Sequence, residues 1–435
     1  MRTRCSLLSL TVALSLALAI VPNTATHRAS YSQQPDAAGI PPSRTALVAP
    51  VSTFSEDEPA QSTATAFSLP VRRTSRANSY AIVPLAPGTL RVQAPGTTRR
   101  VSVASDGSQA NAGSTRPAIS ADGRHIAFCS GATNLVPDDT NEYPDIFVHH
   151  LQTGETERIS IASDGSQANH ASHQPSISAD GRYVAFRSYA SNLVPNDTNG
   201  TVIDVFVRDR EMGQTMLVSV ASDGTQTNAS SGWPAISADG RYVVFQSLAR
   251  TLVSDNNDKS DIFVHDRQTG QTTRVSVASD GTEGNGLSIE PSISSEGRYI
   301  AFYSGANNLV PNDTNGCRDI FVHDRETGAT TRVSVASDGT QVDSGVGVHS
   351  SISADGHYVA FETAATNLAP GDTDGASDVF VHNRKTGQTS DVSATLENTW
   401  CQGLSISADG RYVAFDARAS DLVPNDTNRE PDVFI

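Results

Sequence analysis

The stretch "PSISADGRYVAF", residues 175–186, decides the fold of this chain, because close copies of it recur as far as the last residues. Aligning the copies on the turn that follows "SA" or "SS" gives spacings of 58, 59, 57, 59 and 54 residues. The aligned acidic residues are Asp122, Asp180, Asp239, Glu296, Asp355 and Asp409. A unit of this length, repeated, is typical of arrays in which each unit buries its apolar surface against its neighbours.

Each repeat contains four short β patterns with turn signals between them. The D-G dipeptide separates the first two patterns, "DVFVRD" at 204–209 exemplifies the third, and "TGQTTRVSV" at 269–277 supplies a T-G turn and the fourth. Of the 14 phenylalanines, 12 fall at two repeat positions, one in the second pattern and one in the third. We predict that these phenylalanines form the core.

The two ends of the array predict a closed ring. The sixth repeat stops at Ile435 after its third strand, whereas "TTRRVSV" at 97–103 matches a fourth strand that has no third strand before it. If residues 98–103 complete the last sheet, the ring closes and no sheet edge is left exposed. Radial packing of such sheets buries both of their faces. We therefore predict an all-β, six-bladed β-propeller of four-stranded blades over residues 96–435.

The repeat unit also resembles a known family. "PSISADGRYVAF" followed by "DIFVHDRETGATTRVSV" is similar to the WD40-like (PD40) repeat of the TolB-type propellers, S-P-D-G-k-x-I-a-F and then d-I-y-v-x-d. The resemblance covers roughly residues 97–435 and implies the propeller fold. TolB proteins carry an α/β domain before the propeller and work in the bacterial cell envelope. Residues 26–95 do not resemble that domain, so the partner of TolB is not carried over.

The residues before the repeats indicate export. Arg2 and Arg4 precede an apolar run from Leu7 to Val21, which is shorter than the roughly 20 residues of a spanning helix. We predict a signal peptide at 1–25, a low-complexity leader at 26–95 and a secreted or envelope location without a membrane span after cleavage. The net charge of −16 argues against nucleic acid. We expect a monomer that binds a protein or a glycan.

An acid-rich loop in every repeat admits two interpretations. An acid and a second Asx lie two residues apart, and an Asp then begins the third strand. Calcium takes such carboxylate and amide oxygens on a tight loop, but Asp and Asn side chains also shape turns by bonding their own backbone. Gly316 and Gly375 make two loops the best calcium candidates. Their predicted ligands are Asp313, Asn315, Asp319, Asp372, Asp374 and Asp378.

One position differs in every repeat and is our candidate ligand site. The residues just before the first strand are Arg116, Gln174, Trp233, Glu290, His349 and Gly403. Six-fold symmetry would oppose Arg116 to Glu290, Gln174 to His349 and Trp233 to Gly403. Trp400 joins the set, because a tryptophan in a loop is common at recognition surfaces. Trp233 could equally fill a gap under a loop, for Trp400 that interpretation is preferred, and Arg116 with Glu290 could equally plug the channel.

Signals for catalysis are poor. A histidine recurs at one strand position, at His149, His265, His323 and His382, and is predicted to be structural. Neither H-E-x-x-H nor G-x-S-x-G occurs. We therefore favour a binding or scaffolding module, with calcium as its one candidate cofactor. The alternative is a hydrolase or lyase of extracellular polysaccharide, with carboxylates such as Glu290 and with His349 as acid and base.

Overall fold

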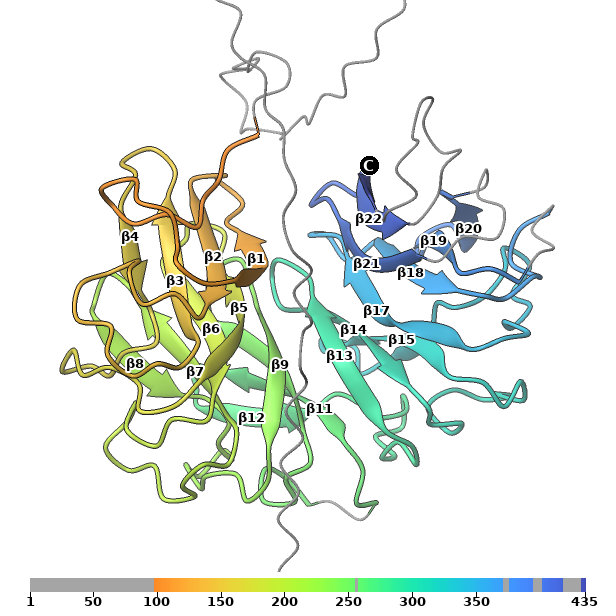
Figure 1. The fold of residues 1–435 in the computed structure, drawn as a ribbon. Coiled ribbons are helices and arrows are strands. Elements are labelled where there is room, and N and C mark those ends of the chain that lie inside the picture. Colours follow the sequence, from red (N-terminus) through yellow and green to blue (C-terminus); the bar gives the residue numbers. More distant parts are fainter. Residues whose placement is uncertain (1–97, 255–256, 371–374, 394–400, 418–431) are drawn as a thin grey trace, which may run out of the picture. The chain divides into compact units, whose positions relative to one another are not determined.

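The computed structural model describes residues 98–435 except 255–256, 371–374, 394–400 and 418–431 (Figure 1). These residues form 23 strands grouped into six antiparallel sheets, arranged as the blades of a ring. The described part of the chain has no helix that could cross a membrane. The predicted signal peptide, 1–25, and leader, 26–95, lie outside the described residues.

The blades follow one another in chain order. Blade 1 contains β1 (Ser114–Ile119), β2 (His125–Ser130), β3 (Asp145–His150) and β4 (Thr156–Arg158). Blade 2 contains β5 (Ser172–Ile177), β6 (Tyr183–Ser188), β7 (Asp204–Asp209) and β8 (Gln214–Leu217). Blade 3 contains β9 (Ser231–Ile236), β10 (Tyr242–Ser247), β11 (Asp261–Asp266) and β12 (Gln271–Arg274). Blade 4 contains β13 (Ser288–Ile293), β14 (Tyr299–Ser304), β15 (Asp319–Asp324) and β16 (Thr330–Arg332). Blade 5 contains β17 (Val346–Ile352), β18 (Tyr358–Thr363), β19 (Asp378–Asn383) and β20 (Gln388–Asp391). Blade 6 contains β21 (Cys401–Ile406), β22 (Val413–Ala417) and β23 (Asp432–Phe434).

The phenylalanines form the core as predicted. Phe245 of β10 and Phe263 of β11 are fully buried and pair directly across the sheet, with ring centroids 6.0 Å apart. The other blades repeat this pair at 5.9–6.1 Å. Around Phe245 the apolar cluster combines β10 with Val205 and Val207 of the preceding blade. The core therefore lies between consecutive blades, which is why no single repeat could fold alone.

The D-G turn shows why the repeat motif is so regular. Gly240 has a φ of +71°, and an added Cβ would lie 2.1 Å from the Tyr183 ring of the preceding blade. Only glycine fits such a backbone conformation at so close an approach. Asp239 fixes the turn by accepting hydrogen bonds from the Ser237 hydroxyl and the Arg241 amide, at 2.6 and 2.9 Å. The motif thus closes a hairpin and contacts the neighbouring blade at once.

The sixth blade differs from our prediction. The six-bladed architecture is confirmed, but β21, β22 and β23 form a three-stranded sheet in the described part of the chain. Residues 98–100, predicted to supply its fourth strand, form no strand, and the Arg99 guanidinium donates instead to the Leu151 carbonyl, at 3.0 Å. Val433 of β23 is 78% exposed, whereas the equivalent residues of the other blades are buried. Ring closure by residues 98–103 is therefore not formed in this structure.

Candidate functional site at the channel mouth

The variable position lies on a bulge in the innermost strand of each blade. In blade 3, Val244 pairs with Ala235 and Gln246 pairs with Gly232, so Trp233 and Pro234 together oppose one residue. Four bulge residues adopt a left-handed backbone, with φ between 50° and 55°: Arg116, Gln174, Trp233 and Glu290. Such a conformation costs of order 1 kcal/mol or more for a residue other than glycine. The fold keeps this cost at equivalent positions while the side chain changes completely.

A second ring of variable residues accompanies the first. It consists of the residue after the phenylalanine of each second strand: Cys129, Arg187, Gln246, Tyr303, Glu362 and Asp416. The Oε1 atom of Gln246 accepts a hydrogen bond from the Glu290 amide of the next blade, at 3.0 Å. Sequence analysis missed this ring, although its signal was available. It is the position that differs in all six repeats beside a phenylalanine that never changes.

Blades 4 to 6 supply an acidic half of the mouth. His349 lies between two carboxylates, with its Nε2 3.5 Å from Glu290 Oε2 and its Nδ1 3.2 Å from Glu362 Oε1. The hydrogen bond with Glu362 raises the pKa of His349 above its ordinary value, with a further contribution from Glu290. Burial raises the pKa of Glu290 and also that of Asp416. The cluster can therefore exchange and hold a proton.

Blades 1 to 3 supply a basic and aromatic half. The Arg116 guanidinium carbon lies 5.1 Å from the centroid of the Trp233 ring, which is a cation–π contact. Gln174 accepts a hydrogen bond from the Trp233 amide, at 3.3 Å. Burial lowers the pKa of the partly buried Arg187. A cavity of 140 Å³ opens beside Arg187 and Trp233.

The contacts add to the predicted pairs of opposed residues. Arg116 lies over Trp233 and also acts on Glu290, where burial raises the pKa of the carboxyl group and the arginine lowers it. His349 pairs with Glu290 of the preceding blade, and its predicted position opposite Gln174 stays a prediction. Trp400 lies outside the described residues, so its predicted role in ligand binding stays a prediction.

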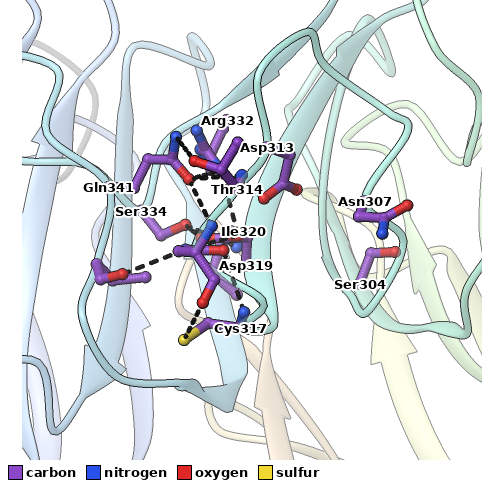
Figure 2. Close-up of polar contacts among 12 residues, drawn as sticks. Ser304, Asn307, Asp313, Thr314, Cys317, Asp319, Ile320, Arg332, Ser334 and Gln341 are labelled. Carbon is purple, nitrogen blue, oxygen red and sulfur yellow. Dashed lines mark hydrogen bonds and ion pairs between the residues drawn. The ribbon is translucent and has the colours of Figure 1, made fainter.

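The acid-rich loop of blade 4 is held by a network of its own side chains (Figure 2). Asp319, at the start of β15, accepts hydrogen bonds from the Ser334 hydroxyl at 2.6 Å and the Asn315 amide at 3.3 Å. The Arg332 guanidinium lies 3.0 Å from Asp313 and 3.4 Å from Asp319. Burial raises the pKa of Asp319, and this arginine opposes the rise. The guanidinium supplies a positive charge next to the carboxylates that the calcium interpretation would assign to the ion.

Calcium binding at these loops remains a prediction. No group of three or more His, Cys, Asp or Glu side chains is arranged to hold a metal within the described ranges. Asp378, predicted as a ligand in blade 5, is buried and accepts a hydrogen bond from the Ser393 hydroxyl at 2.9 Å. Asp372 and Asp374 lie outside the described residues.

Blade 2 is an exception to the loop network. Leu217 stands where blades 1, 3 and 4 have the arginine. Gln226 donates to Asp197 Oδ1 at 2.9 Å, but Asp197 Oδ2 and Asn199 Oδ1 are buried without a hydrogen-bond partner. Burial raises the pKa of Asp204, which begins the third strand of this blade. The same loop therefore exists with and without its guanidinium in one molecule.

The repeated histidines are structural, as predicted. The ring Nδ1 atom of each contacts a threonine hydroxyl of the neighbouring strand at 2.8–2.9 Å. Burial lowers the pKa of His323 and of His382 to about 4, so both are neutral at physiological pH. Arg208 takes the same position in blade 2 and bonds the Thr215 hydroxyl at 3.1 Å.

By its fold the chain is a six-bladed β-propeller with an asymmetric, charged channel mouth. No family model matches it, and no curated protein matches it. TolB from Acinetobacter baumannii shares 19% identity and a TM-score of 0.37, over 64% of this chain and 53% of that chain. A putative TolB from Agrobacterium tumefaciens shares 18% and 0.42, over 70% of this chain and 91% of that chain. An oligogalacturonate lyase in complex with manganese shares 12% and 0.44, over 73% of this chain and 75% of that chain. This chain spans about half the length of the Acinetobacter protein, and the likeness concerns the propeller fold alone.

Proposed function

We propose that this chain is an exported binding protein that recognises a protein or a glycan at its channel mouth. The observation that carries the proposal is the bulge, which presents a different side chain in each blade on an otherwise repeated backbone. A ring that needed only to close would serve equally well with identical residues there. Instead Trp233 and Arg116 gather on one side and Glu290 with His349 on the other. Aromatic and arginine side chains of this kind commonly anchor ligands.

Export is supported by the sequence alone. The charged start and apolar run within residues 1–25 are typical of a secretory signal. We infer a location in the cell envelope or outside the cell. Expression of the full chain with its own N-terminus, followed by N-terminal sequencing of the protein, tests this. A mature protein beginning near residue 26 is expected, whereas an intact N-terminus in the cytoplasm contradicts the inference.

Binding is tested by titrating the purified protein against arrays of glycans and of immobilised peptides. The ligand found is expected to bind at least tenfold more weakly to Trp233→Ala and to Glu290→Gln, with the thermal unfolding midpoint retained. Met212→Ala is the control, because Met212 is 62% exposed outside the channel mouth. Binding that is unchanged in both channel variants would place the ligand elsewhere on the molecule.

A second candidate function is cleavage of a polysaccharide, as a hydrolase or as a lyase. One observation favours it: Glu290, with a raised pKa, lies 3.5 Å from His349, which is itself oriented by Glu362. A carboxyl group and an oriented histidine can act as a general acid and base. An enzyme would lose turnover in His349→Gln and Glu290→Gln while keeping its fold. A protein that binds the same polysaccharide and never shortens it excludes this alternative.

A further inference from the structure

The cavity beside Arg187 carries an inference that rests on the proposed function and makes it more specific. Its 140 Å³ lie between blades 2 and 3, and Arg187, Gly232, Trp233, Gln246 and Ser260 line it; we call it the Arg187 cavity. An added Cβ on Gly232 would lie 3.2 Å from Arg187 Cδ and 3.8 Å from Gln174 Oε1. The side chains of Arg187 and Gln174 therefore meet against the same glycine.

Hydrogen-bond donors at this cavity lack acceptors. The Nε atom of Arg187 is buried and has no hydrogen-bond partner, and no carboxylate within the described residues pairs with this guanidinium. Gln174 is only 6% exposed, and its Nε2 atom also has no partner. The buried hydroxyl of Ser260 is likewise without a partner. Arg187 and Ser260 line the cavity, and Gln174 adjoins Gly232 of its wall. Buried polar groups are normally satisfied, so these donors call for a missing acceptor.

Charge identifies the missing group more closely. The ionisable groups that interact with Arg187 are Tyr189, Arg116, Cys129 and His173, and none of them is a carboxylate. Burial first, and then the nearby Arg116, lowers the pKa of Arg187. A charge that is partly buried without a counterion is unfavourable, because it loses part of its hydration and gains no opposite charge. Water could satisfy the amide and the hydroxyl, but it cannot balance the guanidinium.

Other arginines of the chain show what a satisfied guanidinium looks like. Arg182 and Arg298 each make two hydrogen bonds to one aspartate of their own blade, at 2.7–3.0 Å. Even at the larger cavity of 450 Å³ between blades 1 and 2, Arg210 is paired with Glu157. A buried Nε atom without a partner also occurs in other arginines, Arg332 among them. Arg187 differs from Arg182, Arg298 and Arg210 in that it lines a cavity and is paired with no carboxylate of the described residues.

We propose that the Arg187 cavity binds a single carboxylate group carried by the ligand. A carboxylate matches the guanidinium with two parallel hydrogen bonds, and its remaining lone pairs can accept from Gln174 Nε2 and the Ser260 hydroxyl. One guanidinium balances one negative charge. Trp233 covers the apolar part of the ligand next to the carboxylate. The carboxylates of blades 4 to 6 repel the same group, which fixes the orientation of the ligand across the mouth.

The tryptophan content gives a direct test. The chain has two tryptophans, Trp233 and Trp400, so the full-length Trp400→Phe variant reports fluorescence from Trp233 alone. Two matched pairs of probes separate the sources of a carboxylate: N-acetylglutamate against N-acetylglutamine, and methyl glucuronide against methyl glucoside. We expect at least one acid to bind tenfold more tightly than its neutral twin. The pair of probes that shows this difference identifies the source of the carboxylate. The titrations extend above about 1 mM, which corresponds to the weak end of specific binding. If neither acid binds more tightly than its neutral twin in that range, the inference is wrong.

Arg187→Gln separates a binding role from a structural one. It is expected to abolish the preference for the acid and to keep or raise the unfolding midpoint without ligand, because an uncompensated charge is removed. Arg332→Gln is the matched control, since it removes a paired arginine and should lower the midpoint without changing the preference. An Arg187→Gln protein that unfolds as readily as this control would show that Arg187 serves the fold.

If Arg187→Gln does not fold, the Gly232→Ala variant provides a second test of the inference. The added methyl presses on Arg187 Cδ and narrows the cavity, so the preference for the acid should fall at least tenfold. Unchanged preference in Gly232→Ala contradicts the inference. If neither acid binds but Trp233→Ala still loses a glycan or peptide ligand, only this inference fails. If channel variants change no binding at all, the proposed function fails as well.

Discussion

The acid-rich loops and the channel mouth are both dense in charge, yet one arginine in each has opposite surroundings. In the loop of blade 4, Arg332 lies within 3.4 Å of two buried carboxylates, Asp313 and Asp319. At the channel mouth, Arg187 has no counterion among the described residues, and Glu362 keeps one buried oxygen without a partner. Paired charges of the first kind hold a fold, whereas unpaired charges persist where a ligand completes them.

The largest expected effect comes from breaking a pair in the loop. Arg332→Leu copies the residue that blade 2 has naturally and leaves two buried carboxylates without a cation. Such a change costs about 3–5 kcal/mol of unfolding free energy, to be measured by chemical denaturation. Arg411→Leu is the control, because the Arg411 side chain is 77% exposed, and it should change little. Equal losses in the two variants would mean that the loop pairing contributes nothing particular to stability.

Calcium is expected to have the next largest effect on stability. It distinguishes loops that contain the guanidinium from loops that lack it. A cation should stabilise a loop most where the guanidinium is missing, by about 2.7 kcal/mol at a hundredfold excess over Kd. We expect the shift in unfolding midpoint between EDTA and millimolar calcium to be largest in Arg332→Leu, smaller in the wild type and smallest in Leu217→Arg. Elemental analysis of bound metal accompanies the measurement. The same shift of the unfolding midpoint in all three proteins would show that calcium does not act through these loops.

The buried histidines of the strands predict a loss of stability in acid. Burial lowers the pKa of His323 from 6.5 to about 4, so the unfolded chain binds a proton that the folded chain does not over this range. Stability should therefore fall as the pH drops from 6.5 to 4, by at most about 1.4 kcal/mol per pH unit for this residue. Denaturation of wild type and His323→Gln at several pH values isolates the effect. Parallel pH profiles would contradict the buried, neutral histidine.

The channel histidine predicts a smaller effect of opposite sign. The pKa of His349 is raised, and the charged groups that face it are Glu290, Glu362 and Asp416. Its stabilising contribution is complete below pH 6.5 and is lost as the pH rises through the folded pKa. Wild type should therefore exceed His349→Gln in stability at pH 6 and not at pH 9. A difference that grows in alkali would show that His349 is not paired with these carboxylates.

The contrast also explains what the sequence revealed. Repeat spacing, the D-G turn and the twelve phenylalanines predicted the blades correctly, because these residues act through local turns and the period of a strand. The bulge position was found because it varies within a constant frame. Glu362 and Arg187 were missed because they reach the channel by pairing with a strand that is bulged. The repeat pattern does not show this bulge.

Partners were harder to predict than positions. The role of Arg332 depends on its contact with Asp313, which lies 19 residues earlier in the chain. The spacing of the repeat does not indicate this contact. Six-fold symmetry suggested opposed pairs, but it did not predict that Arg116 of blade 1 lies over Trp233 of blade 3. Closure by residues 98–103 followed from counting strands, but these residues form no strand in the described part of the chain.

One measurement tests the central contrast most directly. It is chemical denaturation of a triple channel variant, Arg187→Gln with Glu290→Gln and His349→Gln, beside Arg332→Leu. If the channel charges are kept for a ligand, the triple variant should lose less than about 1 kcal/mol, well below the loss in Arg332→Leu. A loss in the triple variant as large as that in Arg332→Leu would show that the channel mouth is a structural plug, and the account would be wrong.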